Sequence, residues 1–184
     1  MTLFPRIRRR FPGLPLLAAG GIVDGRTMAA ALVLGADAVW CGSRFLASRE
    51  AEAHDAYKDR VLSADVGDTA ILSIYGPEWP GQAMRAIVND GARAALGREP
   101  EAIDEAEGQI IGSTVLNGRT IPAPRYSAIL PTRDFNGDIE QACLTAGQSA
   151  GNIHEILPAG EIVRRMTREA KAALDGLVAM REAA

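Results

Sequence analysis

Two short segments, each an apolar run followed by glycine, constrain the fold of this chain most. They are residues 16–22 and residues 38–45. Continuous apolar runs of this length are typical of strands in a sheet that is covered on both faces. Between them, residues 24–35 predict one compact helix, with Asp24 as its N-cap and Gly35 as its stop. The order strand, helix, strand predicts two neighbouring parallel strands joined by a right-handed crossover.

The carboxyl ends of these two strands are the candidate ligand site. Neighbouring parallel strands end at the same edge of a sheet, and glycine lets a backbone amide come close to a ligand. Gly20 and Gly21 end the first segment, and Gly42 with Ser43 ends the second. We therefore expect a phosphate cradle there, favoured further by a following helix N-terminus. The alternative is that these glycines only make strand-to-loop turns.

Composition and charge indicate no particular class of binding partner. The chain has 184 residues, 47% of them hydrophobic, and a net charge of −3, which suits one domain with or without an appendage. This balance gives no reason to expect nucleic acid or a membrane surface as partner. Cys41 and Cys143 are too few for a disulfide framework, and no cluster has the spacing of a metal site. We expect a cytoplasmic protein.

The remaining segments alternate less clearly. Helical periodicity predicts a helix near residues 49–62 and another across residues 84–95, with an irregular stretch between them. Asn117-Gly118, flanked by β-branched residues, predicts a hairpin over residues 113–121. A final helix is expected over residues 159–180, with one apolar stripe made of Val163, Met166, Ala170, Leu174 and Leu177.

Residues 18–26 and 34–47 together resemble the carboxyl-terminal half of nitronate monooxygenases, which are FMN-dependent barrel enzymes. The likeness reappears at Ala146-Gly147-Gln148 and over residues 158–163. It implies an α/β fold: a partial (β/α)8 TIM-type barrel made of the last two βα units, with carboxyl-terminal helices and a β-hairpin. Residues 1–97 would form the carboxyl-terminal half of the FMN-binding barrel. Residues 98–184 would form a helical extension with a hairpin, packing back on the barrel.

The resemblance implies which residues bind the cofactor. Amides of Gly20 and Gly21 would meet the phosphate of FMN. The segment after the second strand would close on the same phosphate with Trp40, Cys41, Gly42 and Ser43. Trp40 stands where the family more often has Gln, so only a backbone contact is expected from it. Arg44 could reach the phosphate or form an ion pair, and Gln148 could line the mouth of the site.

The resemblance also implies what lies outside this chain. A barrel of this kind needs eight βα units, and the family's catalytic histidine segment has no counterpart here, so no catalytic residue is predicted. His54 and His154 are expected to be structural. The expected function is oxidation of alkyl nitronates by O2 in an FMN-dependent enzyme, present here as a truncated chain. Its partners would be a nitronate or related small molecule, and a second copy or the missing amino-terminal half-barrel.

Two alternatives stay open from the sequence. The chain could be a non-catalytic fragment or subunit that contributes part of a flavin barrel to an assembly. Its unpaired strand edges would then favour oligomerisation or poor solubility. It could also belong to another phosphate-binding barrel enzyme, such as an enoyl reductase or an IMP dehydrogenase-like protein, which would share the Gly20-Gly21 signal.

Overall fold

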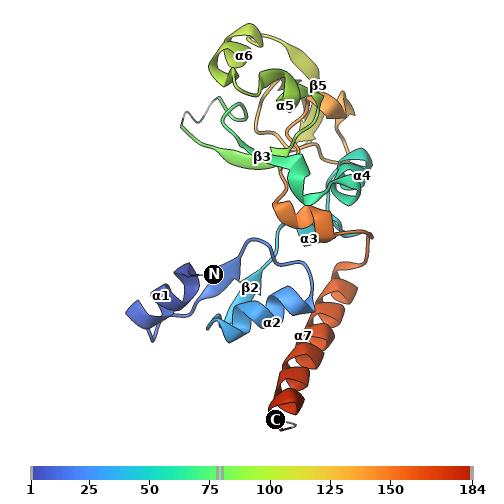
Figure 1. The fold of residues 1–184 in the computed structure, drawn as a ribbon. Coiled ribbons are helices and arrows are strands. Elements are labelled where there is room, and N and C mark those ends of the chain that lie inside the picture. Colours follow the sequence, from blue (N-terminus) through green and yellow to red (C-terminus); the bar gives the residue numbers. More distant parts are fainter. Residues whose placement is uncertain (1, 78, 80, 183–184) are drawn as a thin grey trace. The chain divides into compact units, whose positions relative to one another are not determined.

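The computed structural model describes residues 2–77, 79 and 81–182 (Figure 1). The chain is α/β and divides into two compact units. The first is made by the residues before Ala51 together with those after His154, and the second is Ala51–His154. The boundary expected at residue 97 lies inside the second unit, because the end of the chain returns to pack against its beginning.

The first unit has two strands and four helices in its described part. They are α1 (Leu3–Arg10), β1 (Leu17–Ala19), α2 (Gly25–Val33), β2 (Ala38–Trp40), α3 (Ser43–Leu46) and α7 (Ala159–Glu182). The strands β1 and β2 pair in parallel, with Leu17 opposite Ala38 and Ala19 opposite Trp40. The predicted strand, helix, strand unit is therefore confirmed.

Helix α2 begins at a complete capping box. Asp24 has an extended backbone, and its Oδ1 accepts a hydrogen bond from Thr27 N at 2.8 Å. The Thr27 hydroxyl in turn accepts from Asp24 N at 3.2 Å. Two amide groups at the start of the helix thus find partners within one turn. Asp24 is the N-cap, as the sequence predicts.

The long helix α7 runs beside α2 (Figure 1). Gly25 lies at their contact, where an added Cβ would come within 2.3 Å of Ala170 N and 2.5 Å of Met166 O. The buried face of α7 carries Ile162, Met166 and Ala170, whereas Val163 and Leu177 are exposed. The predicted stripe is therefore wrong at Val163 and Leu177, because α7 turns a slightly different face toward α2 than its own periodicity indicates.

Only one face of the two-stranded sheet is covered. Ala18 and Val39 pack into the core shared with α2 and α7. Leu17 and Trp40, which alternate with them, are 52% and 67% exposed. The expectation of a sheet covered on both faces is not met within the first unit, because its own described elements leave this second face exposed.

Helix α1 stabilises the opposite end of the strands. Arg8 donates through Nε and Nη2 to Gly35 O, at 2.9 Å and 2.7 Å, and its Nη2 lies 2.5 Å from Asp37 Oδ2. The same carboxylate oxygen accepts from Leu16 N at 2.7 Å. Asp37 therefore links the start of β1 to α1 and fixes where β2 begins.

The second unit is built mainly from short strands and helices. Its elements are α4 (Asp55–Ser63), η1 (Val66–Asp68), β3 (Thr69–Leu72), β4 (Met84–Ile87), α5 (Asp90–Ala95), α6 (Glu99–Glu105), β5 (Ile110–Leu116), β6 (Arg119–Pro124), β7 (Asn136–Gly137), η2 (Ile139–Gln141) and η3 (Gln148–Asn152). β3 pairs antiparallel with β4, and β5 lies between β6 and β7. The turn of the β5–β6 hairpin is formed by Asn117 and Gly118, with φ values of 51° and 75°. The predicted hairpin is confirmed.

Two predicted helices of this unit differ in the structure. The first begins at Asp55 rather than near residue 49, because Ser48 forms a bridge with Leu157 and Arg49 N donates to Leu157 O at 3.0 Å. The second is a helix only over Asp90–Ala95. Met84–Ile87 is a strand, because its backbone groups pair with Thr69–Leu72.

A buried polar network fixes the core of the second unit. The Asn89 side chain is fully buried and caps α5, accepting from Ala92 N at 3.0 Å and donating to Ala142 O at 2.8 Å. The Tyr75 hydroxyl donates to Asn89 Oδ1 at 3.3 Å. A buried amide side chain with its hydrogen bonds made in this way specifies one packing arrangement.

Candidate functional site

The ends of β1 and β2 lie side by side within the first unit. Ala19 and Trp40 are the last paired residues of the ladder, so Gly20 and Cys41 follow at the same edge of the sheet. The structure thus brings together the two glycine-bearing segments that the sequence singles out. Both segments belong to one compact unit, and the geometry of the site depends on that unit alone.

The backbone after β1 takes a conformation that suits glycine. Gly20 has a φ of +90° and Gly21 a φ of +74°, values that residues with a Cβ rarely adopt. A Cβ built at Gly20, Gly21 or Gly42 would meet no atom within 4 Å, other than its chain neighbours. The space above these three backbone positions is therefore accessible to a group from outside the chain.

Two amide groups at this edge are available as donors. Within the described ranges, the N–H groups of Gly21 and Gly42 donate to no protein acceptor. The carbonyl of Gly42 accepts hydrogen bonds from Phe45 N and Leu46 N, at 2.9 Å and 3.0 Å. These two bonds stabilise the turn that leads into α3. Unpaired amides in a glycine-rich turn are the donor set that phosphate groups use in proteins.

The side chains of Trp40 and Cys41 point to different surroundings. The Trp40 side chain is exposed, on the uncovered face of the sheet. Cys41 lines an apolar cavity of about 200 Å³ with residues of α2, α3 and α7. Burial raises the pKa of the Cys41 thiol, which keeps it protonated near neutral pH. Any contact of Cys41 with an anion would thus come from its backbone.

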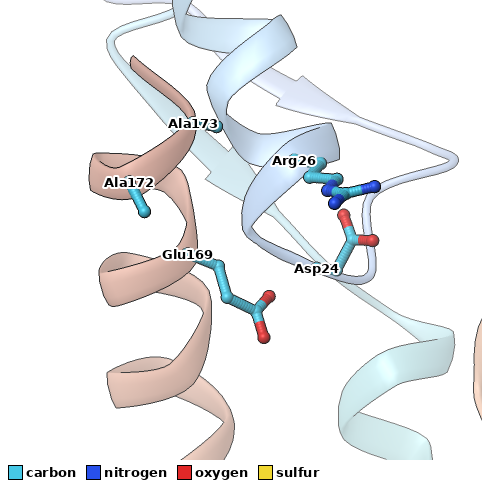
Figure 2. A pocket seen from close by; sticks show the side chains of 5 residues that line it. All are labelled: Asp24, Arg26, Glu169, Ala172 and Ala173. Carbon is cyan, nitrogen blue, oxygen red and sulfur yellow. The ribbon is translucent and has the colours of Figure 1, made fainter. Parts of the chain in front are cut away.

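The start of α2 does not contribute a free helix end. Thr27 N is bonded to Asp24, and Gly25 N donates to Glu169 Oε2 on α7 at 3.0 Å. Figure 2 shows Asp24 and Arg26 at the start of α2 with Glu169, Ala172 and Ala173 of α7. These five residues line a hollow of about 570 Å³. The carboxylates of Asp24 and Glu169 lie in this hollow and engage amides at the start of α2. The N-terminus of α2 is therefore unfavourable for a phosphate group.

The Arg44 guanidinium is bound by carbonyl groups of the protein. It is buried, and its Nη2 donates to Ala47 O at 3.2 Å and to Glu155 O at 2.8 Å. Its contacts are therefore with carbonyl groups of the protein. These two hydrogen bonds go to backbone carbonyls, so they are neither the ion pair nor the phosphate contact that the sequence suggests for Arg44.

The histidines and Gln148 lie in the second unit. His54 caps α4, with its Nδ1 accepting from Ala56 N at 3.2 Å, and His154 and Gln148 are exposed. No group of three His, Cys, Asp or Glu side chains in the described chain is arranged to hold a metal ion. Among the same residues, no helix is long and apolar enough to cross a membrane.

The sequence does not predict a role for Glu169, and it does not predict the structural contacts of Arg44. Each acts through a contact between residues far apart in the chain, Glu169 with Gly25 and Arg44 with Glu155. Local periodicity places Glu169 on a polar face of its helix and carries no sign of that contact. The sequence carries no signal that separates Glu169 from Glu161 on the same helix.

The family model and several curated relatives are nitronate monooxygenases. The family model described as nitronate monooxygenase matches residues 1–169. The nitronate monooxygenase of Paraburkholderia phytofirmans is 30% identical over 164 residues, which are 89% of this chain and 40% of that protein. The chain spans less than half the length of the curated relatives it matches.

Solved structures give the same picture of the fold. FabK from Thermotoga maritima is 30% identical with a TM-score of 0.70, and the match covers 97% of this chain and 50% of that one. Nitroalkane oxidase from Streptomyces ansochromogenes has a TM-score of 0.64 at 24% identity, covering 96% of this chain and 44% of that one, and shares the fold. Because the family model matches residues 1–169 of its 184 residues, the chain belongs to the nitronate monooxygenase family.

Proposed function

We propose that this chain is the cofactor-phosphate-binding part of an FMN-dependent oxidoreductase of the nitronate monooxygenase type, which oxidises alkyl nitronates with O2. The observation that carries the proposal is the pair of unengaged amides, Gly21 N–H and Gly42 N–H, at the ends of two adjacent parallel strands. Hydrogen bonds from backbone amides to a phosphate dianion are charge-assisted and therefore strong.

The proposed phosphate site comprises Gly20, Gly21, Trp40, Cys41, Gly42 and Ser43. The positive φ values of Gly20 and Gly21 turn the chain at the strand end, and no Cβ fills the space above them. Trp40 and Cys41 would take part through their backbone, because the indole lies on the exposed sheet face and the thiol lines an apolar cavity. Ser43 adds a hydroxyl at the first position of α3.

We further propose that β1, α2, β2 and α3 are the last two βα units of a (β/α)8 barrel. Support comes from the parallel pairing and from the exposed face that carries Leu17 and Trp40. In such a barrel that face would meet side chains of the other strands and become part of a packed interior. The partner proposed for it is an amino-terminal half-barrel, and a second copy of the chain is the other candidate.

FMN, when bound, would supply the redox chemistry of the reaction. The residues of this chain would bind its phosphate and orient the ring system. The first unit, residues 1–50 and 155–184, contains no histidine in its sequence, so no acid–base group for the nitronate is assigned from it. In this proposal the chain binds the cofactor, and no residue of its first unit is assigned to proton transfer.

Absorbance and turnover of the purified protein test the proposal. Bound FMN gives visible flavin bands, and the flavin released on denaturation should be FMN. Oxygen uptake with an alkyl nitronate, in the presence of the half-barrel partner, is expected for the proposed reaction. Oxidation of a nicotinamide cofactor with an enoyl thioester would instead support the enoyl reductase alternative. A colourless protein that leaves the spectrum of added FMN unchanged would contradict the proposal.

A further inference from the structure

Arg44 is a charged side chain buried in the first unit, one residue after the proposed phosphate-binding segment. Its relative exposure is 6%. Burying a guanidinium is costly unless hydrogen bonds replace those it made to water. Within the described part of the chain its Nε has no partner, and burial lowers its pKa. Because burial of this guanidinium is unfavourable, we expect Arg44 to have a specific role in the local structure.

The hydrogen bonds of Arg44 join two segments. Nη2 donates to Ala47 O, which follows α3 directly, and to Glu155 O, which lies just ahead of α7. The neighbouring backbone reinforces this junction. Arg49 N donates to Leu157 O at 3.0 Å, and Glu50 Oε2 accepts from Ala159 N at 2.8 Å at the start of α7.

The junction limits the freedom of the glycine turn. Helix α3 has only four residues, too few to be stable through its own hydrogen bonds. Ala47 N donates to Ser43 O at 3.3 Å, and Phe45 N and Leu46 N donate to Gly42 O. Fixing the carboxyl end of α3 therefore fixes the Gly42–Ser43 peptide plane, which carries the Ser43 N–H. The Cys41–Gly42 peptide, which carries the Gly42 N–H, is then held between the end of β2 and this fixed start of α3.

We propose that Arg44 is a positioning residue for phosphate binding: it anchors α3 to the segment before α7 and so pre-orients the Gly42 and Ser43 amides. This inference rests on the proposed function. Donors held in place before binding lose less freedom when the ligand arrives, so anchoring raises affinity for the phosphate group alone. Arg44 is not expected to touch the phosphate, because its Nη2 is already engaged by two carbonyls and its Nε is buried.

The test compares affinities for FMN and riboflavin, which differ only by the phosphate. Arg44→Met removes both hydrogen bonds and keeps an unbranched side chain. We expect it to lower the affinity for FMN about tenfold, the effect of losing one strong hydrogen bond, and to leave riboflavin affinity unchanged. Arg44→Lys should restore most of the loss, because both carbonyls are served by one nitrogen and an ammonium group has three donors.

Arg164→Met is the matched control. Arg164 lies on α7 with an exposed side chain that pairs with Glu161 at 3.0 Å. The same change there should leave the FMN to riboflavin ratio as in the unaltered chain. If Arg44→Met fails to fold, Arg44→Gln, whose polar side chain is too short to reach both carbonyls, is measured in its place with the same expected loss.

The outcomes separate the two proposals. Equal loss of FMN and riboflavin affinity in the Arg44 variants, or no loss of FMN affinity, overturns the positioning role and leaves the proposed function standing. If the unaltered chain itself binds FMN no better than riboflavin, the phosphate site is wrong and the role of Arg44 fails with it.

Discussion

Ala19 and Trp40 lie opposite each other as the last pair of the parallel β1–β2 ladder. Beyond this pair the backbone turns away at both strands, with Gly20 and Gly21 after β1 and Gly42 after Cys41 at the end of β2. The relationship places Gly21 and Gly42 at one edge of one sheet, although 21 positions separate them in the sequence (42 − 21). The cofactor proposal depends on this pairing.

Gly42→Ala tests whether the space at the glycine turn is used. Gly42 has a φ of −93°, which any residue adopts, and an added Cβ would meet no atom within 4 Å. The free energy of unfolding should therefore stay within about 0.5 kcal/mol of the unaltered value. FMN affinity should fall about tenfold, because a methyl group displaces the phosphate from its donors. Calorimetric titration with FMN measures the affinity, and urea unfolding measures stability. Unchanged FMN binding would argue against this turn as the site.

Gly25→Ala tests the close contact of α2 with α7. The new methyl group would lie 2.3 Å from Ala170 N, a backbone atom that cannot move without shifting the helix. We expect a loss of about 1–3 kcal/mol in the free energy of unfolding, as for other overpacked sites. Gly13→Ala is the control, because its Cβ would meet nothing within 4 Å. Similar urea midpoints for both variants would show that the two helices do not pack this closely in solution.

Asp37 should make stability depend on pH in the acid range. Hydrogen bonds from Leu16 N and Arg8 lower the pKa of the Asp37 carboxyl below its ordinary value. Because the folded-state pKa is the lower one, the contribution of Asp37 is complete above its ordinary pKa near 3.8 and is lost as pH falls through the folded value. Asp37→Asn should therefore destabilise the chain at pH 7 and become equal to the unaltered chain at low pH. A constant gap between the two urea midpoints from pH 7 to the acid limit would refute this.

Trp40→Gln tests whether the side chain at this position matters for the phosphate. The indole is exposed, and only the backbone of Trp40 is assigned to the site. We expect the ratio of FMN to riboflavin affinity to change less than twofold, since no hydrogen bond to the phosphate is lost. Trp79→Gln, at another exposed tryptophan in the second unit, serves as comparison. A large fall in the ratio in Trp40→Gln alone would assign a direct contact to the indole.

The start of α2 and the turn between β5 and β6 could be predicted because their signals are local. Asp24 with Thr27 makes a capping box within one turn, and Asn117-Gly118 sets its own turn geometry. Met84–Ile87 could not be predicted in this way, because Met, Arg and Ala favour helices and its strand exists only through pairing with Thr69–Leu72.

The candidate site divides in the same manner. The glycines of the turns are visible in the sequence, since a positive φ and close backbone approach call for glycine. The role of Arg44 depends on Glu155, more than one hundred positions away, and the closed start of α2 depends on Glu169. Such contacts follow from the return of α7 to α2, which no local pattern encodes.

The most direct test of the central claim is a titration of the isotopically labelled chain with FMN, followed by the amide resonances of Gly21 and Gly42. The account predicts that both resonances shift on addition of FMN and that riboflavin at the same concentration moves them much less. Amides at the opposite ends of the strands, such as Leu16 N bonded to Asp37, should stay in place. If Gly21 and Gly42 remain unmoved while FMN binds elsewhere, the strand-end phosphate site is contradicted.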